Sequence, residues 1–169
     1  MNSETIHTLA VLVENRPGVL ARISGLLSRR AFNIESIAAG PTEEPDVTRI
    51  TLVVRGNEDT LGQVTSQLGK LVDVIKIADM TSGNCVHREL ALIKVAAPEE
   101  RRRSIIDIVE IFRAKIVDVH KEALVIEMSG EETKIDALLD ILKDYGIIEL
   151  ARTGRITLGR GPVPAKAST

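Results

Sequence analysis

The fold of this chain is decided by residues 7–40, which read HTLAVLVENRPGVLARISGLLSRRAFNIESIAAG. A continuous apolar run at residues 9–13 predicts a strand inside a sheet, and a polar turn at residues 14–18 follows it. Apolar side chains then recur at helical spacing over residues 19–27, which predicts an amphipathic helix. Residues 32–39 predict a second strand. The order is therefore strand, tight turn, helix, strand.

The turn before this helix is suited to hold an anion. The first turn of a helix exposes backbone N–H groups that have no acceptor within the helix. Pro17 suits the first helical position because its missing N–H loses nothing there, and Gly18 has no Cβ, so a ligand can approach closely. The sequence therefore predicts a small carboxylate-binding corner, and no obvious catalytic group is near it.

The rest of the chain completes this pattern and repeats it once. Further strands are predicted at residues 50–54, 72–78, 90–96, 116–119, 124–128 and 147–150. Asn57 can cap the second helix, and Ser129 with Glu132 predicts a capping box before the last one. Each half then has the order βαββαβ.

A βαββαβ unit folds as a four-stranded antiparallel sheet with both helices on one face, the ferredoxin-like plan. We therefore predict an α+β chain of two such units, at residues 6–80 and 88–159, with a linker at 81–87 and a flexible tail at 160–169. The other face of each sheet stays bare unless a second unit or a second chain covers it. We expect a homodimer for that reason.

Composition excludes several classes of function. The 169 residues are 44% hydrophobic with one tyrosine and two phenylalanines, so the core must be aliphatic. A net charge of −2 predicts no attraction to nucleic acid or to anionic membranes. No apolar run approaches the ~20 residues of a membrane span, and the single cysteine, Cys85, fits a reducing compartment. We expect a cytoplasmic protein, or one of the plastid stroma if it comes from a plant.

No catalytic or metal-binding constellation is found in the sequence. His7, His87 and His120 have no cysteine or carboxylate at metal-ligand spacing apart from Cys85, and two residues do not make a zinc site. The arginines at residues 101–103 are balanced by neighbouring acids, and no predicted strand carries the aromatic pair of an RNA-recognition module. We expect neither catalysis nor nucleic-acid binding.

Asn15 and Asn33 are the candidate binding residues. Each has a plainer interpretation, because Asn15 fits a turn or helix cap and Asn33 fits a tight entry into a strand. Together they suggest an α-amino acid site. Amides near Gly18 would bind the carboxylate, the two asparagine carbonyls would accept from the ammonium, and Ile34 and Ile37, or Leu20, would line an apolar slot.

The chain resembles the regulatory small subunit of acetolactate synthase (acetohydroxyacid synthase) over about residues 8–160. The resemblance rests on residues 14–22 (ENRPGVLAR), 32–37 (FNIESI), 68–74 (LGKLVDV), 88–94, 110–119 (EIFRAKIVDV) and 151–154 (ARTG). The NRPG turn marks the wider class of ACT domains, and the NIES and EIFRAKIVDV segments narrow it to this subunit.

The resemblance implies a function. Residues 6–80 would be an effector-binding ACT domain, and residues 88–159 the C-terminal domain of the small subunit. Such a subunit has no catalysis of its own. It activates a catalytic large subunit, which holds thiamine diphosphate, FAD and Mg²⁺, and it confers feedback inhibition by a branched-chain amino acid, usually valine.

The resemblance also implies the effector residues, at the interface of two ACT domains. These are Asn15, Pro17, Gly18, Val19, Leu20, Asn33, Ile34 and Ile37. Ala21 departs from members that carry a hydroxyl residue there. Two other classes of protein stay open, a free-standing amino-acid sensor that regulates another partner and an enzyme in its own right.

Overall fold

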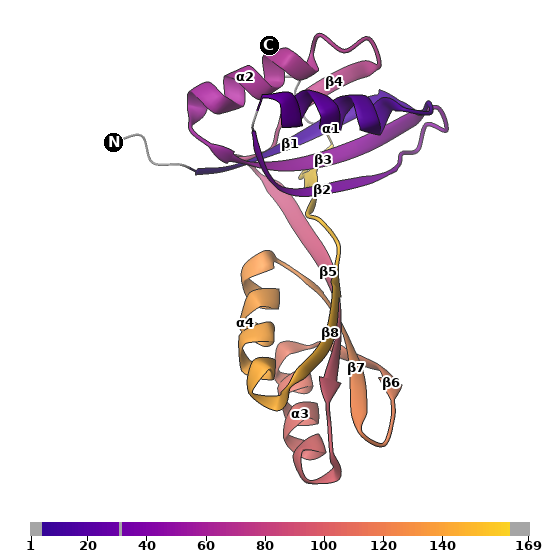
Figure 1. Ribbon diagram of the computed structural model, residues 1–169, viewed down its shortest axis with the longest axis vertical. Coiled ribbons are helices and arrows are strands. Elements are labelled where there is room, and N and C mark those ends of the chain that lie inside the picture. Colours follow the sequence, from indigo (N-terminus) through magenta and orange to yellow (C-terminus); the bar gives the residue numbers. More distant parts are fainter. Residues whose placement is uncertain (1–4, 31, 163–169) are drawn as a thin grey trace. The chain divides into compact units, whose positions relative to one another are not determined.

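The computed structural model describes residues 5–30 and 32–162, and their contacts form two compact units (Figure 1). His87–Gly154 is the second unit, and the described residues before and after it make the first. Each unit is an antiparallel sheet with two helices, so the predicted α+β fold of two βαββαβ units is confirmed. Within the described ranges, no helix is both long and apolar enough to cross a membrane.

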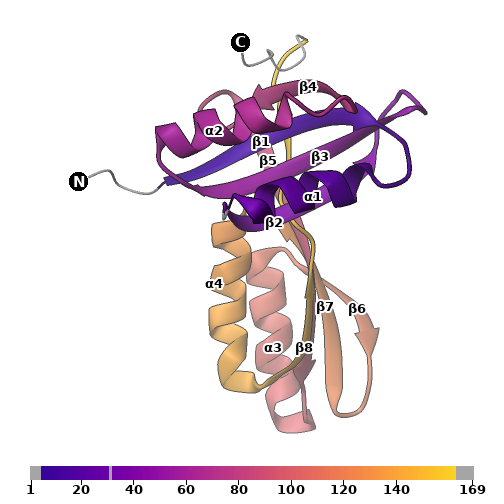
Figure 2. The ribbon, with the colours of Figure 1, turned by 45° about the horizontal axis from the view of Figure 1, so that its top comes forward.

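The first unit is a four-stranded sheet with the strand order β2-β3-β1-β4, and each neighbouring pair is antiparallel. Its elements are β1 (Thr5–Glu14), α1 (Val19–Arg29), β2 (Asn33–Pro41), β3 (Val47–Gly56), α2 (Glu58–Leu68) and β4 (Val74–Asp79). Figure 2 shows both helices on the same face of this sheet. The strands β2 and β4 are its two edges.

The core of the first unit is aliphatic and lies between the sheet and its helices. Its buried members are Leu9, Val11, Val13, Val19, Ile23, Leu27, Ile50, Leu52, Leu61, Val64, Leu68 and Ile77. The strand β1 is central, and its alternate residues Thr8 and Ala10 are buried on the opposite face. Burial on both faces explains the continuous apolar run in the sequence.

The helix-free face of this sheet carries small side chains and is covered partly by Met80 and Cys85 and partly by the end of the chain. Ala10, Thr51 and Ala78 are buried there although no helix lies over them. The segment from Arg155 returns to this face and includes β9 (Ile156–Gly159), whose Thr157 is buried. Small side chains let this extra strand approach the sheet closely.

Side chains fasten the returning segment to the sheet. The Arg155 guanidinium donates to Thr8 Oγ1 at 3.1 Å, and the Arg155 N–H donates to Ser36 Oγ at 3.4 Å. Arg49 of β3 donates from Nη2 to the Thr157 carbonyl at 2.9 Å. The segment therefore contacts β1, β2 and β3 of the first unit.

Two predicted boundaries differ from the structure. Residues 156–159, assigned from the sequence to the second unit, group with the first by their contacts, although β9 pairs with β5 in the second sheet. The predicted linker at 81–87 is strand from Cys85, since β5 begins there and pairs with β9. In the predicted tail, the Arg160 N–H donates to the Asn84 carbonyl at 2.7 Å, and residues 163–169 lie outside the described residues.

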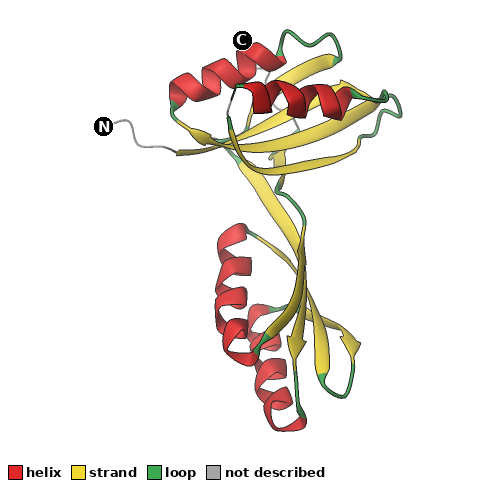
Figure 3. Cartoon of the chain, in the orientation of Figure 1, coloured by secondary structure: helices red, strands yellow, loops and turns green. Residues whose placement is uncertain are grey.

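The second unit repeats the first, with the strand order β6-β7-β5-β8. Its elements are β5 (Cys85–Ala96), α3 (Glu99–Phe112), β6 (Lys115–Val119), β7 (Ala123–Gly130), α4 (Glu132–Leu142), a 3-10 turn η1 (Lys143–Tyr145) and β8 (Ile147–Arg152) (Figure 3). Its core is again aliphatic, around Ile93, Ile126 and Ile135. Arg152 ties the sheet to α4 through ion pairs with Glu89 at 2.6 Å and Asp136 at 2.7 Å.

One of the two predicted helix caps is found in the structure and the other is not. Asn57 caps α2, and its side-chain oxygen accepts from the Thr60 N–H at 2.9 Å. The capping box of Ser129 and Glu132 is wrong, because β7 continues to Gly130 and Glu131 is the N-cap of α4 without a side-chain cap bond. Pairing of Leu90 with Ser129 in the sheet commits the serine to a strand.

Candidate functional site

The turn between β1 and α1 forms an open helix N-terminus. Gly18 is the N-cap, with φ 84° and ψ −6°, and it has no side chain that could cap the helix. The first turn holds no acidic residue. Among the described residues no acceptor is found for the N–H groups of Leu20 and Ala21, while the Arg22 N–H donates to the Gly18 carbonyl. Two adjacent donors at a positive helix end can therefore bind a carboxylate.

Asn15 is held beside this corner by the loop between β2 and β3. Its backbone N–H donates to the Asp46 carbonyl at 2.7 Å, and its side-chain N–H donates to the Pro45 carbonyl at 3.3 Å. These bonds use the backbone N–H and one of the two side-chain N–H groups, and they leave the side-chain carbonyl as an acceptor, in the orientation assigned to the amide. Asn15 can therefore accept from an ammonium group.

Arg22 of α1 lies beside the turn at Gly18. An added Cβ on Gly18 would lie 3.4 Å from its Nη1. Its Nε and Nη2 both approach Oδ2 of Asp73 at 2.8 Å, and Asp73 is buried. Arg22 and Asp73 are 51 positions apart, so no local sequence pattern could have shown this ion pair. The one signal in the sequence is the four-residue spacing of Gly18 and Arg22, which places Arg22 one helical turn after Gly18.

Asn33 does not meet Asn15 within one chain. It begins β2 and pairs with Arg55, at the end of the sheet where Thr5 pairs with Gly56. Asn15 follows Glu14, which ends β1 at the other end of the sheet. Nine residues of strand separate the two ends, about 30 Å at ~3.3 Å per residue. The two asparagines can share a ligand only across two chains.

The predicted lining residues divide into two groups. Val19 is buried in the core, and Ile34 is half-buried against it. Leu20 and Ile37 are 48% and 39% exposed, and Pro17 is exposed as well. Apolar surface for a ligand at this place therefore comes from Leu20 and Ile37.

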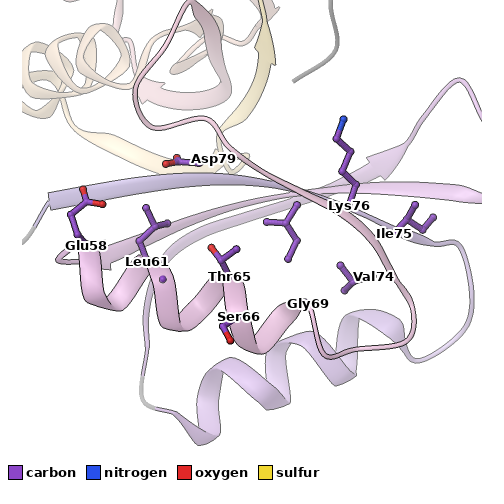
Figure 4. Close-up of a pocket in the computed structure, with 11 residues that line it drawn as sticks. Glu58, Leu61, Thr65, Ser66, Gly69, Val74, Ile75, Lys76 and Asp79 are labelled. Atoms are coloured by element: carbon purple, nitrogen blue, oxygen red, sulfur yellow. The ribbon is translucent and has the colours of Figure 1, made fainter. Parts of the chain in front are cut away.

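A separate hollow of about 660 Å³ lies between α2 and the edge strand β4 (Figure 4). Gly62, Ser66 and Gly69 lie along its helix side, and small side chains there leave the groove open. Figure 4 shows Glu58 and Asp79 toward one end. The predicted site residues do not line it, and it plays no part in the carboxylate corner.

The family of the chain follows from comparison with known proteins. Residues 9–76 match the "AHAS small subunit-like ACT domain", and residues 88–161 match the "Small subunit of acetolactate synthase". The acetolactate synthase small subunit of Mycolicibacterium smegmatis is 52% identical over 161 residues, which cover 95% of each chain. This chain belongs to the acetolactate synthase small-subunit family.

Two further relatives agree with this membership of the small-subunit family. The probable small subunit of Archaeoglobus fulgidus is 51% identical over 155 residues, 92% of this chain and 97% of its own. The crystal structure of the Thermotoga maritima small subunit has a TM-score of 0.87 and 39% identity, and it covers 94% of this chain and 99% of that one. The resemblance seen in the sequence is thus confirmed.

The equivalent turn of the second unit lacks the open helix N-terminus found at Gly18. In the second unit, Pro98 is the N-cap of α3 and Glu99 and Glu100 occupy its first turn. Two carboxylates at that place repel an anionic ligand. The Arg102 guanidinium donates to the carbonyls of Ala97 and His120, so the turn is closed onto the next loop.

Proposed function

We propose that this chain is the non-catalytic regulatory subunit that activates acetolactate synthase and transmits feedback inhibition by a branched-chain amino acid, with valine as the expected effector. The open helix N-terminus at Gly18, in a chain of the small-subunit family, is the observation that supports this. Thiamine diphosphate, FAD and Mg²⁺ would be held by the catalytic subunit. The cytoplasm, or the plastid stroma in a plant, would be its compartment.

We propose further that a homodimer completes the effector site. β2 is an edge strand and offers an unpaired backbone to a second copy. Antiparallel pairing of two β2 strands about a two-fold axis sets Asn33 of one copy opposite Pro41 of the other. Pro41 pairs with Thr48, and the adjacent Val47 pairs with Glu14, so this is the end that carries the turn.

The dimer brings together the groups that an amino acid needs. The N–H groups of Leu20 and Ala21 would bind the carboxylate, and the Asn15 carbonyl would accept from the ammonium. Asn33 of the second copy would supply another acceptor, and Leu20 and Ile37 would contact the aliphatic side chain. One methylene is worth only ~1–3 kcal/mol in such a pocket, so valine, leucine and isoleucine must be compared directly.

Two measurements test this function. The chain should co-purify with an acetolactate synthase catalytic subunit and raise its activity, and added valine should then lower that activity. Calorimetric titration should give micromolar binding, roughly −6 to −8 kcal/mol, for one branched-chain amino acid. Amino-acid binding without any effect on the catalytic subunit would favour a free-standing sensor instead, and turnover by the isolated chain would favour an enzyme.

A further inference from the structure

A second hollow of the first unit lies on the helix-free face of its sheet and has a volume of about 510 Å³. The returning C-terminal segment forms one wall through Leu158, and β1 forms another through Leu12. The loop after β2 contributes Glu43 and Glu44. Arg49 of β3 lines the same space, and its volume is within the range of ligand sites.

Arg49 is incompletely paired in this hollow. Its Nη2 donates to the Thr157 carbonyl at 2.9 Å, but its Nε is buried from solvent and has no hydrogen-bond partner among the described residues. Thr157 Oγ1 is buried and equally without a partner in that part of the chain. A charged group with an unpaired donor is costly to bury, so the Arg49 guanidinium, which lines the hollow, keeps hydrogen-bonding capacity that its contacts within the chain do not use.

The hollow has a positive charge inside it and two negative charges at its rim. Burial lowers the pKa of the Arg49 guanidinium, while the Glu43 carboxylate nearby acts in the opposite direction. Glu43 and Glu44 are exposed at the rim of the hollow, and neither forms an ion pair with Arg49 within the described residues. The acids at the rim would repel a simple anion. A ligand that carries both a carboxylate and an ammonium group would suit the inner cation and the outer acids together.

We propose that this hollow is a second binding site for a small aliphatic amino acid, separate from the corner at Gly18. Its carboxylate would accept from Arg49, its ammonium would face Glu43 and Glu44, and its side chain would contact Leu12 and Leu158. The site lies within one chain and does not need a dimer. It stands independently of the proposed function, since it rests on Arg49 and not on the Gly18 turn.

The two sites would share a loop. Residues 42–46 supply Glu43 and Glu44 to the hollow, and Pro45 and Asp46 hold Asn15 by two hydrogen bonds. A ligand against the acids therefore acts on the same loop that positions Asn15.

Equilibrium binding of L-valine and L-leucine to the full-length chain tests the proposal. Gly18→Asp removes the carboxylate corner, Arg49→Met removes the inner cation, and Lys70→Met is the control for loss of an exposed cation in the same unit. We expect Gly18→Asp to retain one site per chain, and Arg49→Met in that background to weaken it by about 30-fold or more. Lys70→Met should leave it unchanged.

Chemical analogues separate the two charges. Isobutylamine lacks the carboxylate and 3-methyl-2-oxobutanoate lacks the ammonium, so neither should bind the Gly18→Asp chain. If Arg49→Met fails to fold, the pair of substitutions Glu43→Gln and Glu44→Gln serves instead, because both residues are exposed. In the Gly18→Asp background this pair should weaken amino-acid binding about 10-fold. Gly18→Asp chains that fold but bind no amino acid would overturn the second site. Binding lost with Arg49→Met alone and unaffected by Gly18→Asp would instead overturn the effector site and leave this one standing.

Discussion

Substitution of Gly18 by aspartate should abolish effector binding without unfolding the chain. Gly18 has φ 84°, a conformation in which glycine is favoured and Asp and Asn are the best tolerated replacements. The new Cβ would lie 3.4 Å from Arg22 Nη1, the far end of a flexible side chain, so no backbone needs to move. The strain is about 1 kcal/mol, and a carboxylate at the helix N-terminus recovers ~0.3–1 kcal/mol.

The loss of affinity can be worked from the charges. The aspartate carboxylate would lie in the corner that the effector carboxylate uses, at a separation of about 5 Å. At an effective dielectric constant of about 20, the repulsion is ~3 kcal/mol, a factor of about 150 in the dissociation constant. Occupation of the Leu20 and Ala21 N–H groups by the new side chain adds to this.

Gly18→Asn is the matched control. It has the same shape and the same backbone strain as Gly18→Asp but no charge, so it should lose distinctly less affinity. The assay is inhibition of the reconstituted catalytic subunit by valine, with its activation measured in parallel. Activation should persist in both variants. Equal inhibition in Gly18→Asp and the unsubstituted chain, or equal losses in Asp and Asn variants, would refute the assignment of the carboxylate corner.

Three further results are expected. Asn33→Ala should weaken amino-acid binding by about 1–3 kcal/mol in a calorimetric titration, because a hydrogen bond to the ammonium is lost; an unchanged affinity would remove Asn33 from the site. Saturating valine should tighten dimerisation in a sedimentation dilution series, since only the dimer has the whole site; a dimerisation constant indifferent to valine would place the effector within one chain. A chain ending at Gly154 should lower the Tm of the first unit by ~10 °C in calorimetry, because the sheet loses β9 and its hydrogen bonds to Arg49 and Thr8; an unaltered first transition would show that this cover contributes no stability.

Local patterns predicted the parts of this fold that local physics decides. The β1–α1 turn and the Asn57 cap each depend on a few neighbouring residues, and both are found, although α1 begins at Val19 and Pro17 precedes it. Ser129 satisfied a local capping pattern, but pairing with Leu90 in the sheet overrode it. The strand β9 has four residues and too short a pattern to be recognised.

For the candidate site, the sequence predicts which residues share a turn but not how distant segments are arranged. Asn15 and Gly18 lie together because the same turn carries them. Asn33 lies at the far end of the sheet, a result of strand register that composition cannot give. Arg22 and Asp73 meet across 51 residues, so their pairing is visible only in three dimensions.

The return of the chain to its first unit also sets an order of assembly. The first unit is interrupted between Val86 and Arg155 by the whole of the second. During synthesis its four main strands leave the ribosome early, yet β9 emerges only after the second unit has been made. Until then the Arg49–Thr157 and Arg155–Thr8 hydrogen bonds cannot form, and the part of the sheet face that the returning segment covers stays open. The domain that begins translation first is therefore the last to be completed.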